Sequence, residues 1–169
     1  ISLSRPIYDR LAAIDATGLE PKTTYTLDRA LTDYQLAGVD RDAATRAKVQ
    51  ALQQEITELG LTFARNIREA KSEMVLKSAD DLAGLPQDYL DAHKPGPDGL
   101  IRINTDYPDA FPILEFADKE EVRMNMRTIF NNRAWPANEA VLKALLTKRY
   151  ELARLLDFPN YAALITKDM

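Results

Sequence analysis

The chain has 169 residues, of which 46% are hydrophobic and 28% are charged, a balance typical of a globular protein of about one domain. Its net charge of -4 disfavours nucleic acid as a partner, because phosphate binding needs clustered lysine and arginine. The absence of cysteine excludes disulfides, thiolate nucleophiles and cysteine-ligated metals. No stretch approaches the roughly 20 apolar residues that span a bilayer, so we expect no membrane partner either.

The N-terminal end and the composition bear on processing and compartment. The chain begins at Ile1 without an initiating methionine or a signal-like apolar run, and we therefore expect that the natural N-terminus is missing. A sequence without cysteine fits a reducing compartment, so we predict a cytoplasmic location, although a periplasmic protein could have the same composition.

Helical signals dominate the first 71 residues. A first helix is predicted from its N-cap at Ser4 to a stop at Gly18, and a second from about Pro21 to Ala37. The longest predicted helix is capped by Asp40 or Asp42 and reaches about residue 71. Apolar residues recur along it at spacings of three and four, which indicates a narrow buried stripe. The stripe is Val49, Leu52, Ile56, Leu59, Phe63 and Ile67.

The period of the pattern changes in the middle of the chain. Two or three short antiparallel strands are predicted there, separated by small helices at Ala79–Ala83 and Gln87–His93. Pro112 lies in the third candidate strand and favours an edge position for it, because proline cannot donate to a sheet ladder. The candidate strands are residues 73–78, 99–104 and 111–116.

Helices return after Asp118. One is predicted from Lys119 to Asn131 and another from an N-cap at Asn138 to Leu156, followed by a short helix that begins at Asn160 after Pro159. One face of the second is predicted to carry Leu142, Leu145, Leu146, Arg149, Ala153 and Leu156. The sequence thus predicts a mainly α (α+β) fold with one long helix and a small antiparallel β segment. We find no linker and predict a single helical domain over residues 1–169.

Residues able to perform chemistry are scarce. A catalytic zinc site needs about three protein ligands, and the single histidine, His93, cannot supply them, so we interpret it as a surface or capping residue. No serine lies in a Gly-x-Ser-x-Gly elbow, and no glycine-rich phosphate loop is present. The doublets Asp80–Asp81 and Glu120–Glu121 fall at predicted helix starts, where the helix dipole favours carboxylates. We predict no catalytic, cofactor-binding or metal-ligating residue in this chain.

Four other side chains have a functional and a structural interpretation. Trp135 could line a binding groove, but a tryptophan before proline favours packing at a helix–helix corner. Tyr107 could donate to a ligand, but we favour packing with a satisfied hydroxyl. Met124 and Met126 are two residues apart on a helix, so they should point to different faces and form no methionine groove.

Four segments, in register from about Tyr8 to Met169, resemble the zinc oligopeptidase family of thimet oligopeptidase, neurolysin, oligopeptidase A and peptidyl-dipeptidase. The segments are YQLAGVDRDAATRAKVQALQQEITELGLTFARNI, LAGLPQDYL, INTDYPDAFPILEFA and NNRAWPANEAVLKALLTKRYELARLLDFPNYAALITKDM. The His-Glu-x-x-His helix of the family has no counterpart in this chain, so no catalytic residue can be carried over. The chain also has Asp157 and Phe158 where the family often has Gly-Tyr.

The resemblance implies a fragment of the non-catalytic N-terminal part of a zinc-dependent oligopeptidase that hydrolyses short peptides. Such a fragment would form a wall of the substrate channel, would be inactive alone, and would leave the zinc on the missing part. The alternative is a free-standing helical module that binds a peptide or protein without catalysis. Whether the parent enzyme is an endopeptidase or removes C-terminal dipeptides stays open.

A fragment should expose apolar surface that the missing catalytic domain, or self-association, would cover. We expect this surface along the stripe of the long helix and on the faces that carry Leu142 and Leu145.

Overall fold

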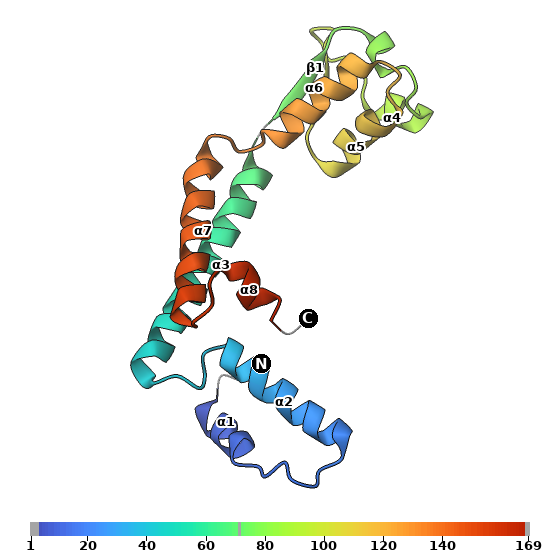
Figure 1. Ribbon diagram of the computed structural model, residues 1–169. Coiled ribbons are helices and arrows are strands. Elements are labelled where there is room, and N and C mark those ends of the chain that lie inside the picture. Colours follow the sequence, from blue (N-terminus) through green and yellow to red (C-terminus); the bar gives the residue numbers. More distant parts are fainter. Residues whose placement is uncertain (1–3, 71, 168–169) are drawn as a thin grey trace. The chain divides into compact units, whose positions relative to one another are not determined.

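The computed structural model describes residues 4–70 and 72–167, and Figure 1 shows its helices and its sheet. The predicted mainly helical α+β class is confirmed, with one two-stranded antiparallel sheet in the part described. In chain order the elements are α1 (Arg5–Ala12), α2 (Pro21–Leu36), α3 (Ala43–Glu69), β1 (Glu73–Leu76), the 3-10 helix η1 (Ala79–Leu82), α4 (Gln87–Ala92), β2 (Ile101–Asn104), α5 (Tyr107–Phe116), α6 (Glu120–Asn131), α7 (Ala137–Leu155) and α8 (Tyr161–Ile165). Within the described ranges, no helix has both the length and the apolar character needed to cross a bilayer.

The chain packs into two compact units. The first contains the residues up to Thr62 together with those from Ala140 onward, and the second is Phe63–Glu139. Both limits fall inside helices, α3 and α7, so neither a loop nor a change of composition marks them in the sequence. The expectation of one domain over residues 1–169 stays a prediction.

In the first unit, α3 and α7 lie side by side (Figure 1), and Lys148 of α7 pairs with Glu55 of α3 at 3.0 Å. The start of α3 is fixed by Asp42, whose carboxylate accepts hydrogen bonds from the backbone N–H groups of Ala44 and Thr45. Asp42 is therefore the N-cap, which decides between the two candidates. The core of this unit is Val49, Leu152, Ala153, Leu156 and Leu164.

The face predicted for α7 is only partly correct. Leu145 is buried as expected, but Leu142 and Leu146 are exposed, and the buried set instead includes Leu152. The buried residues Leu152 and Ala153 follow the buried Leu145 by seven and eight positions, which places all three on one side of the helix. Of the two residues expected to mark uncovered surface, Leu142 is thus exposed and Leu145 is not.

The turn after α7 contains Asp157, a non-glycine residue with a positive φ. Asp157 has a φ of 67°, in the left-handed region that normally favours glycine. Its carboxylate accepts a hydrogen bond from Nη1 of Arg41 at 2.7 Å, and this contact raises the pKa of the Arg41 guanidinium. The side chain of Asn160 then caps α8 by accepting the N–H of Ala163, as its position predicts.

The second unit is built on the sheet. Strands β1 and β2 pair antiparallel with Glu73 opposite Asn104 and Leu76 opposite Ile101. Alternate residues of both strands face α5 and α6, which pack against each other beside the sheet (Figure 1). The buried residues of this core are Met74, Leu76, Leu82, Leu85, Tyr89, Ile101, Ile103, Ala110, Ile113, Ala117, Val122 and Met126.

The predicted third strand, residues 111–116, is wrong, because this segment lies in helix α5. The alternation that suggested a strand overlaps a helical spacing, since the buried residues Ala110, Ile113 and Ala117 follow one another at three and four positions. Asp106 precedes the helix, and proline occupies its first turn. Pro112 lies inside the helix rather than at a sheet edge.

The predicted role of Asn138 as an N-cap is also wrong. The residue lies in the first turn of α7 and is buried, with its side chain directed at α3. Its amide N–H donates to the carbonyl oxygen of Phe63 at 3.0 Å, and its oxygen accepts from the side chain of Asn66 at 2.8 Å. A buried amide is retained here because both of its hydrogen-bonding ends have partners.

Candidate functional site

His93 is the C-cap residue of α4, as its position predicts, although its side chain is only 13% exposed. Its Nδ1 lies 2.9 Å from the carbonyl oxygen of Tyr89, and its Nε2 lies 3.4 Å from a carboxylate oxygen of Asp109. The ring stacks on that of Tyr89. The hydroxyl of Tyr89 donates to the carbonyl oxygen of Asp109 at 2.6 Å. Burial, and then the nearby Asp109 carboxylate, raise the pKa of Tyr89 well above its ordinary value.

This cluster does not fit a hydrolytic zinc site. Both ring nitrogens of His93 already face partners, and the second carboxylate oxygen of Asp109 accepts a hydrogen bond from Asn104. Across residues 4–70 and 72–167, no three His, Cys, Asp or Glu side chains gather closely enough to hold a metal ion. The arrangement instead ties α4 to the start of α5, and we derive no metal-dependent step from it.

The acidic doublets occupy the positions that the sequence predicts. Asp80 and Asp81 lie in the first turn of η1, and Glu120 and Glu121 in the first turn of α6. A hydrogen bond from Lys119 at 2.7 Å lowers the pKa of the Asp81 carboxyl. Asp81 therefore has a structural partner, and all four carboxylates lie at helix starts, where the helix dipole favours them.

The structure contradicts the interpretation of Trp135 and shows packing contacts for Tyr107. Trp135 is 69% exposed, so the predicted packing at a helix–helix corner is wrong. Tyr107 packs on Phe111 and Phe130 with ring centroids 5.2 and 5.8 Å apart, while its own ring stays largely exposed. The guanidinium of Arg133 lies 3.7 Å above the ring of Phe130.

Met124 and Met126 confirm the prediction of opposite faces. Met126 is fully buried in the core of the second unit, whereas Met124 is exposed.

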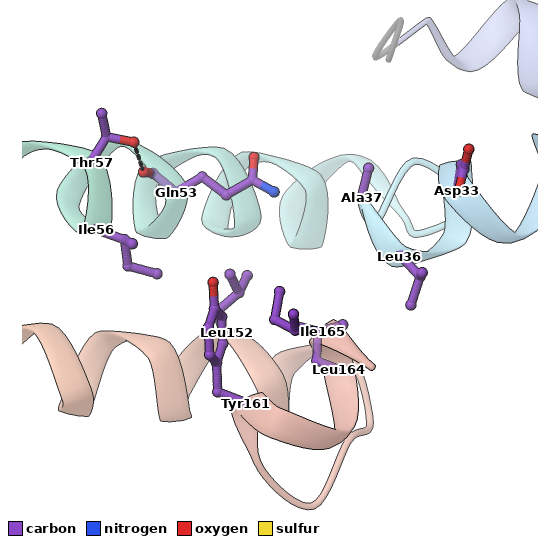
Figure 2. A pocket seen from close by; sticks show the side chains of 10 residues that line it. All are labelled: Asp33, Leu36, Ala37, Gln53, Ile56, Thr57, Leu152, Tyr161, Leu164 and Ile165. Atoms are coloured by element: carbon purple, nitrogen blue, oxygen red, sulfur yellow. Dashed lines mark hydrogen bonds between the residues drawn. The ribbon is translucent and has the colours of Figure 1, made fainter. Parts of the chain in front are cut away.

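A groove with a volume of about 560 Å³ lies in the first unit (Figure 2). Residues from α2, α3, α7 and α8 line it, so two consecutive helices from the start of the chain and two from its end contribute. We call it the α2–α8 groove. Its lining residues are Asp33, Leu36, Ala37, Gln53, Ile56, Thr57, Leu152, Tyr161, Leu164 and Ile165. This volume lies within the range of about 300 to 1,000 Å³ that small-ligand sites occupy.

The groove is apolar at its floor and polar along one side. Leu152 and Leu164 are buried and belong to the core of the unit, which makes the floor rigid. Gln53 and Thr57 lie one turn apart on α3, and the Thr57 hydroxyl donates to the carbonyl oxygen of Gln53 at 2.8 Å. Figure 2 shows the hydroxyl of Tyr161 directed across the groove toward α3. Sequence reasoning missed this site, because each lining residue belongs to an ordinary helical pattern.

Sequence comparison connects the chain to peptidases. Saccharolysin of Saccharomyces cerevisiae is 28% identical over 153 residues, which cover 87% of this chain and 21% of that protein. Oligopeptidase A of Escherichia coli is 28% identical over 152 residues, or 80% of this chain and 22% of that protein. A probable thimet oligopeptidase of Arabidopsis thaliana is 24% identical over 90% of this chain and 21% of that protein.

No protein-family model matches the chain. The chain spans about a fifth of the length of these curated relatives, and each alignment covers most of the chain itself. Alignments that cover 80 to 90% of the chain must include residues of both compact units. Over most of its length the chain is therefore similar to saccharolysin, oligopeptidase A and a probable thimet oligopeptidase.

Proposed function

We propose that this chain is a non-catalytic helical part of a zinc-dependent oligopeptidase that hydrolyses short peptides. The observation that carries the proposal is the similarity to oligopeptidases over 80 to 90% of this chain. The residue inventory supports it, because one imidazole and no thiol make a poor ligand set for a catalytic zinc. In this proposal the water-activating zinc is held by residues outside this chain.

The role proposed for the chain is to form a wall of the substrate channel. A wall that excludes large substrates must be stiff, and α3, with 27 residues, is a continuous helix about 40 Å long. Within the first unit Glu55 of α3 pairs with Lys148 of α7, and within the second Asn66 of α3 donates a hydrogen bond to Asn138 of α7. Leu142, Leu146 and Tyr150 follow one another at four-residue spacing and are exposed, so one face of α7 is available to a further part of an enzyme.

The catalytic part of the proposal is tested on the purified chain. With added zinc, the chain should not hydrolyse a quenched fluorescent oligopeptide, and calorimetry should detect no zinc site tighter than about micromolar, because the ligand set is incomplete. The His93→Ala variant should behave in the same way. Zinc-dependent hydrolysis, or sub-micromolar zinc binding that survives this substitution, would contradict the proposal.

The wall role needs a complete enzyme. Replacing the matching segment of Escherichia coli oligopeptidase A with this chain should give an enzyme that cleaves short peptides and leaves long unfolded proteins intact. Zinc content and circular dichroism of the chimera serve as controls for assembly. A folded, zinc-loaded chimera that degrades long unfolded proteins as readily as short peptides would show that this segment does not limit access.

A further inference from the structure

We propose that the α2–α8 groove binds a short apolar peptide by its free amino terminus. The inference rests on the proposed function, since it names a class of peptide that this part of an oligopeptidase would hold. It is carried by three properties of the groove: its volume, the composition of its walls and the sign of its charge.

Each of the four helices that line the groove contributes apolar side chains to it. Leu36 of α2 and Ile56 of α3 face Leu152, Leu164 and Ile165 across the groove (Figure 2). A space of about 560 Å³ is too small for a folded partner and suits a few residues of extended chain. Apolar side chains that enter it leave water for a surface continuous with the buried core.

The polar side of the groove can satisfy a peptide backbone. The side-chain amide of Gln53 offers N–H donors and a carbonyl acceptor, and the hydroxyl of Tyr161 can donate or accept. The ring of Tyr161 is held in place by Arg149, whose guanidinium lies 5.2 Å from its centroid. A peptide N–H or C=O that enters the groove therefore finds partners that cost no rearrangement of the helices.

The charge of the groove selects one end of the peptide. Of the ten described residues that line it, Asp33 is the one that carries a formal charge. Its side chain is 32% exposed, and its contact with Arg29, one turn earlier on α2, is long at 4.0 Å. Such an exposed pair is weak, so an ammonium group can share the carboxylate. A C-terminal carboxylate in the same place would be repelled by Asp33 and would have to compete with it for Arg29.

The test uses the full 169-residue chain and a fluorescent tetrapeptide of leucine and alanine with a free amino terminus. The dye is attached at the C-terminal end, and binding is followed by anisotropy in the presence of a chelator. Acetylating the peptide should weaken binding about two- to fivefold, the range of an exposed ion pair. The Asp33→Asn substitution should weaken binding of the free peptide by a similar factor. It should not change binding of the acetylated peptide.

Two matched controls separate the groove from the rest of the surface. Asp28→Asn removes another exposed carboxylate of α2 and should not change binding. Ile165→Ala removes an apolar wall residue that is 48% exposed, so the fold should tolerate it while the peptide binds several times more weakly. Ile7→Ala, at 45% exposure on α1, is its counterpart away from the groove and should have no effect.

The inference is overturned if free and acetylated peptides bind equally, if neither shows saturable binding, or if binding persists unchanged in both Asp33→Asn and Ile165→Ala. Each of these outcomes leaves the channel-wall proposal intact, since that depends on the zinc measurement and the chimera. Conversely, tight zinc binding and peptide hydrolysis by the chain would refute the proposed function. The same peptide titration would still test whether the groove binds the free amino terminus.

Discussion

Replacing Gly84 with alanine should be among the most damaging single changes in the second unit. Gly84 lies between η1 and α4 with a φ of 91°, a backbone conformation that residues with a side chain rarely adopt. A Cβ at this position would overlap the carbonyl oxygen of Phe116 and lie 2.6 Å from a carboxylate oxygen of Asp118. The Asp118 side chain could rotate away, but Phe116 ends α5 and its carbonyl belongs to the backbone. The neighbouring hydrogen bond from Asp118 N–H to the carbonyl of Ala83, at 2.9 Å, holds the two segments together.

The expected loss has two parts. A left-handed backbone costs an alanine roughly 1 to 2 kcal/mol relative to glycine. Forcing a methyl group into closely packed surroundings costs about 1 to 3 kcal/mol more. Gly84→Ala should therefore lower the free energy of unfolding by about 2 to 5 kcal/mol, which is a large fraction of the stability of a typical domain.

Gly18→Ala is the matched control. Gly18 also has a positive φ, 80°, but nothing lies within 4 Å of a Cβ placed there. It should therefore show the conformational cost alone, about 1 to 2 kcal/mol. Urea unfolding followed by circular dichroism measures both variants against the parent chain. Equal losses at Gly84 and Gly18 would refute the argument, because they would show that the close approach of Phe116 adds nothing.

Two further predictions concern the core and the response to pH. Met126→Ala should cost about 2 to 5 kcal/mol, because it leaves a cavity at a fully buried position, whereas the exposed Met124→Ala should change the unfolding free energy by less than about 0.5 kcal/mol. Hydrogen bonding from Arg102, with a further bond from the Leu100 N–H, lowers the pKa of Asp98 from 3.8 to about 2. A carboxyl with a lowered folded pKa stabilises the protein above the pKa of the unfolded chain, and this contribution is lost as pH falls through the folded pKa. Asp98→Asn should thus lower the midpoint temperature of unfolding at pH 7. The difference from the parent chain should shrink between about pH 4 and pH 2. Thermal melts across this range in which the difference stayed constant would contradict the prediction.

Local sequence signals located most of the helices and their ends. Asp42 and Asn160 cap α3 and α8 through hydrogen bonds to residues two or three positions away, so their role is contained in a few neighbouring residues. The paired strands were also visible, residues 73–78 as a short, partly β-branched segment and residues 99–104 as an alternating one, and β1 and β2 confirm them. These predictions succeeded because each depends on contacts within one turn or along one strand.

The failures share a dependence on distant residues. Residues 111–116 carry both an alternating and a helical pattern, and the buried spacing of Ala110, Ile113 and Ala117 against the sheet decided for the helix. Asn138 has a side chain suited to a cap, but Phe63 and Asn66, more than 70 residues earlier in the chain, engage it instead.

Read alone, the amino-acid sequence determined the helical class, the resemblance to the oligopeptidases and the shortage of metal-ligating side chains, since these depend on composition, periodicity and order. Only the tertiary structure decided which side of α7 is buried, how His93 is engaged by Tyr89 and Asp109, and that α2, α3, α7 and α8 enclose a groove. The physical reason is that a periodic pattern states how apolar a helix face is, whereas the identity of the surface that covers it depends on packing between segments far apart in the chain.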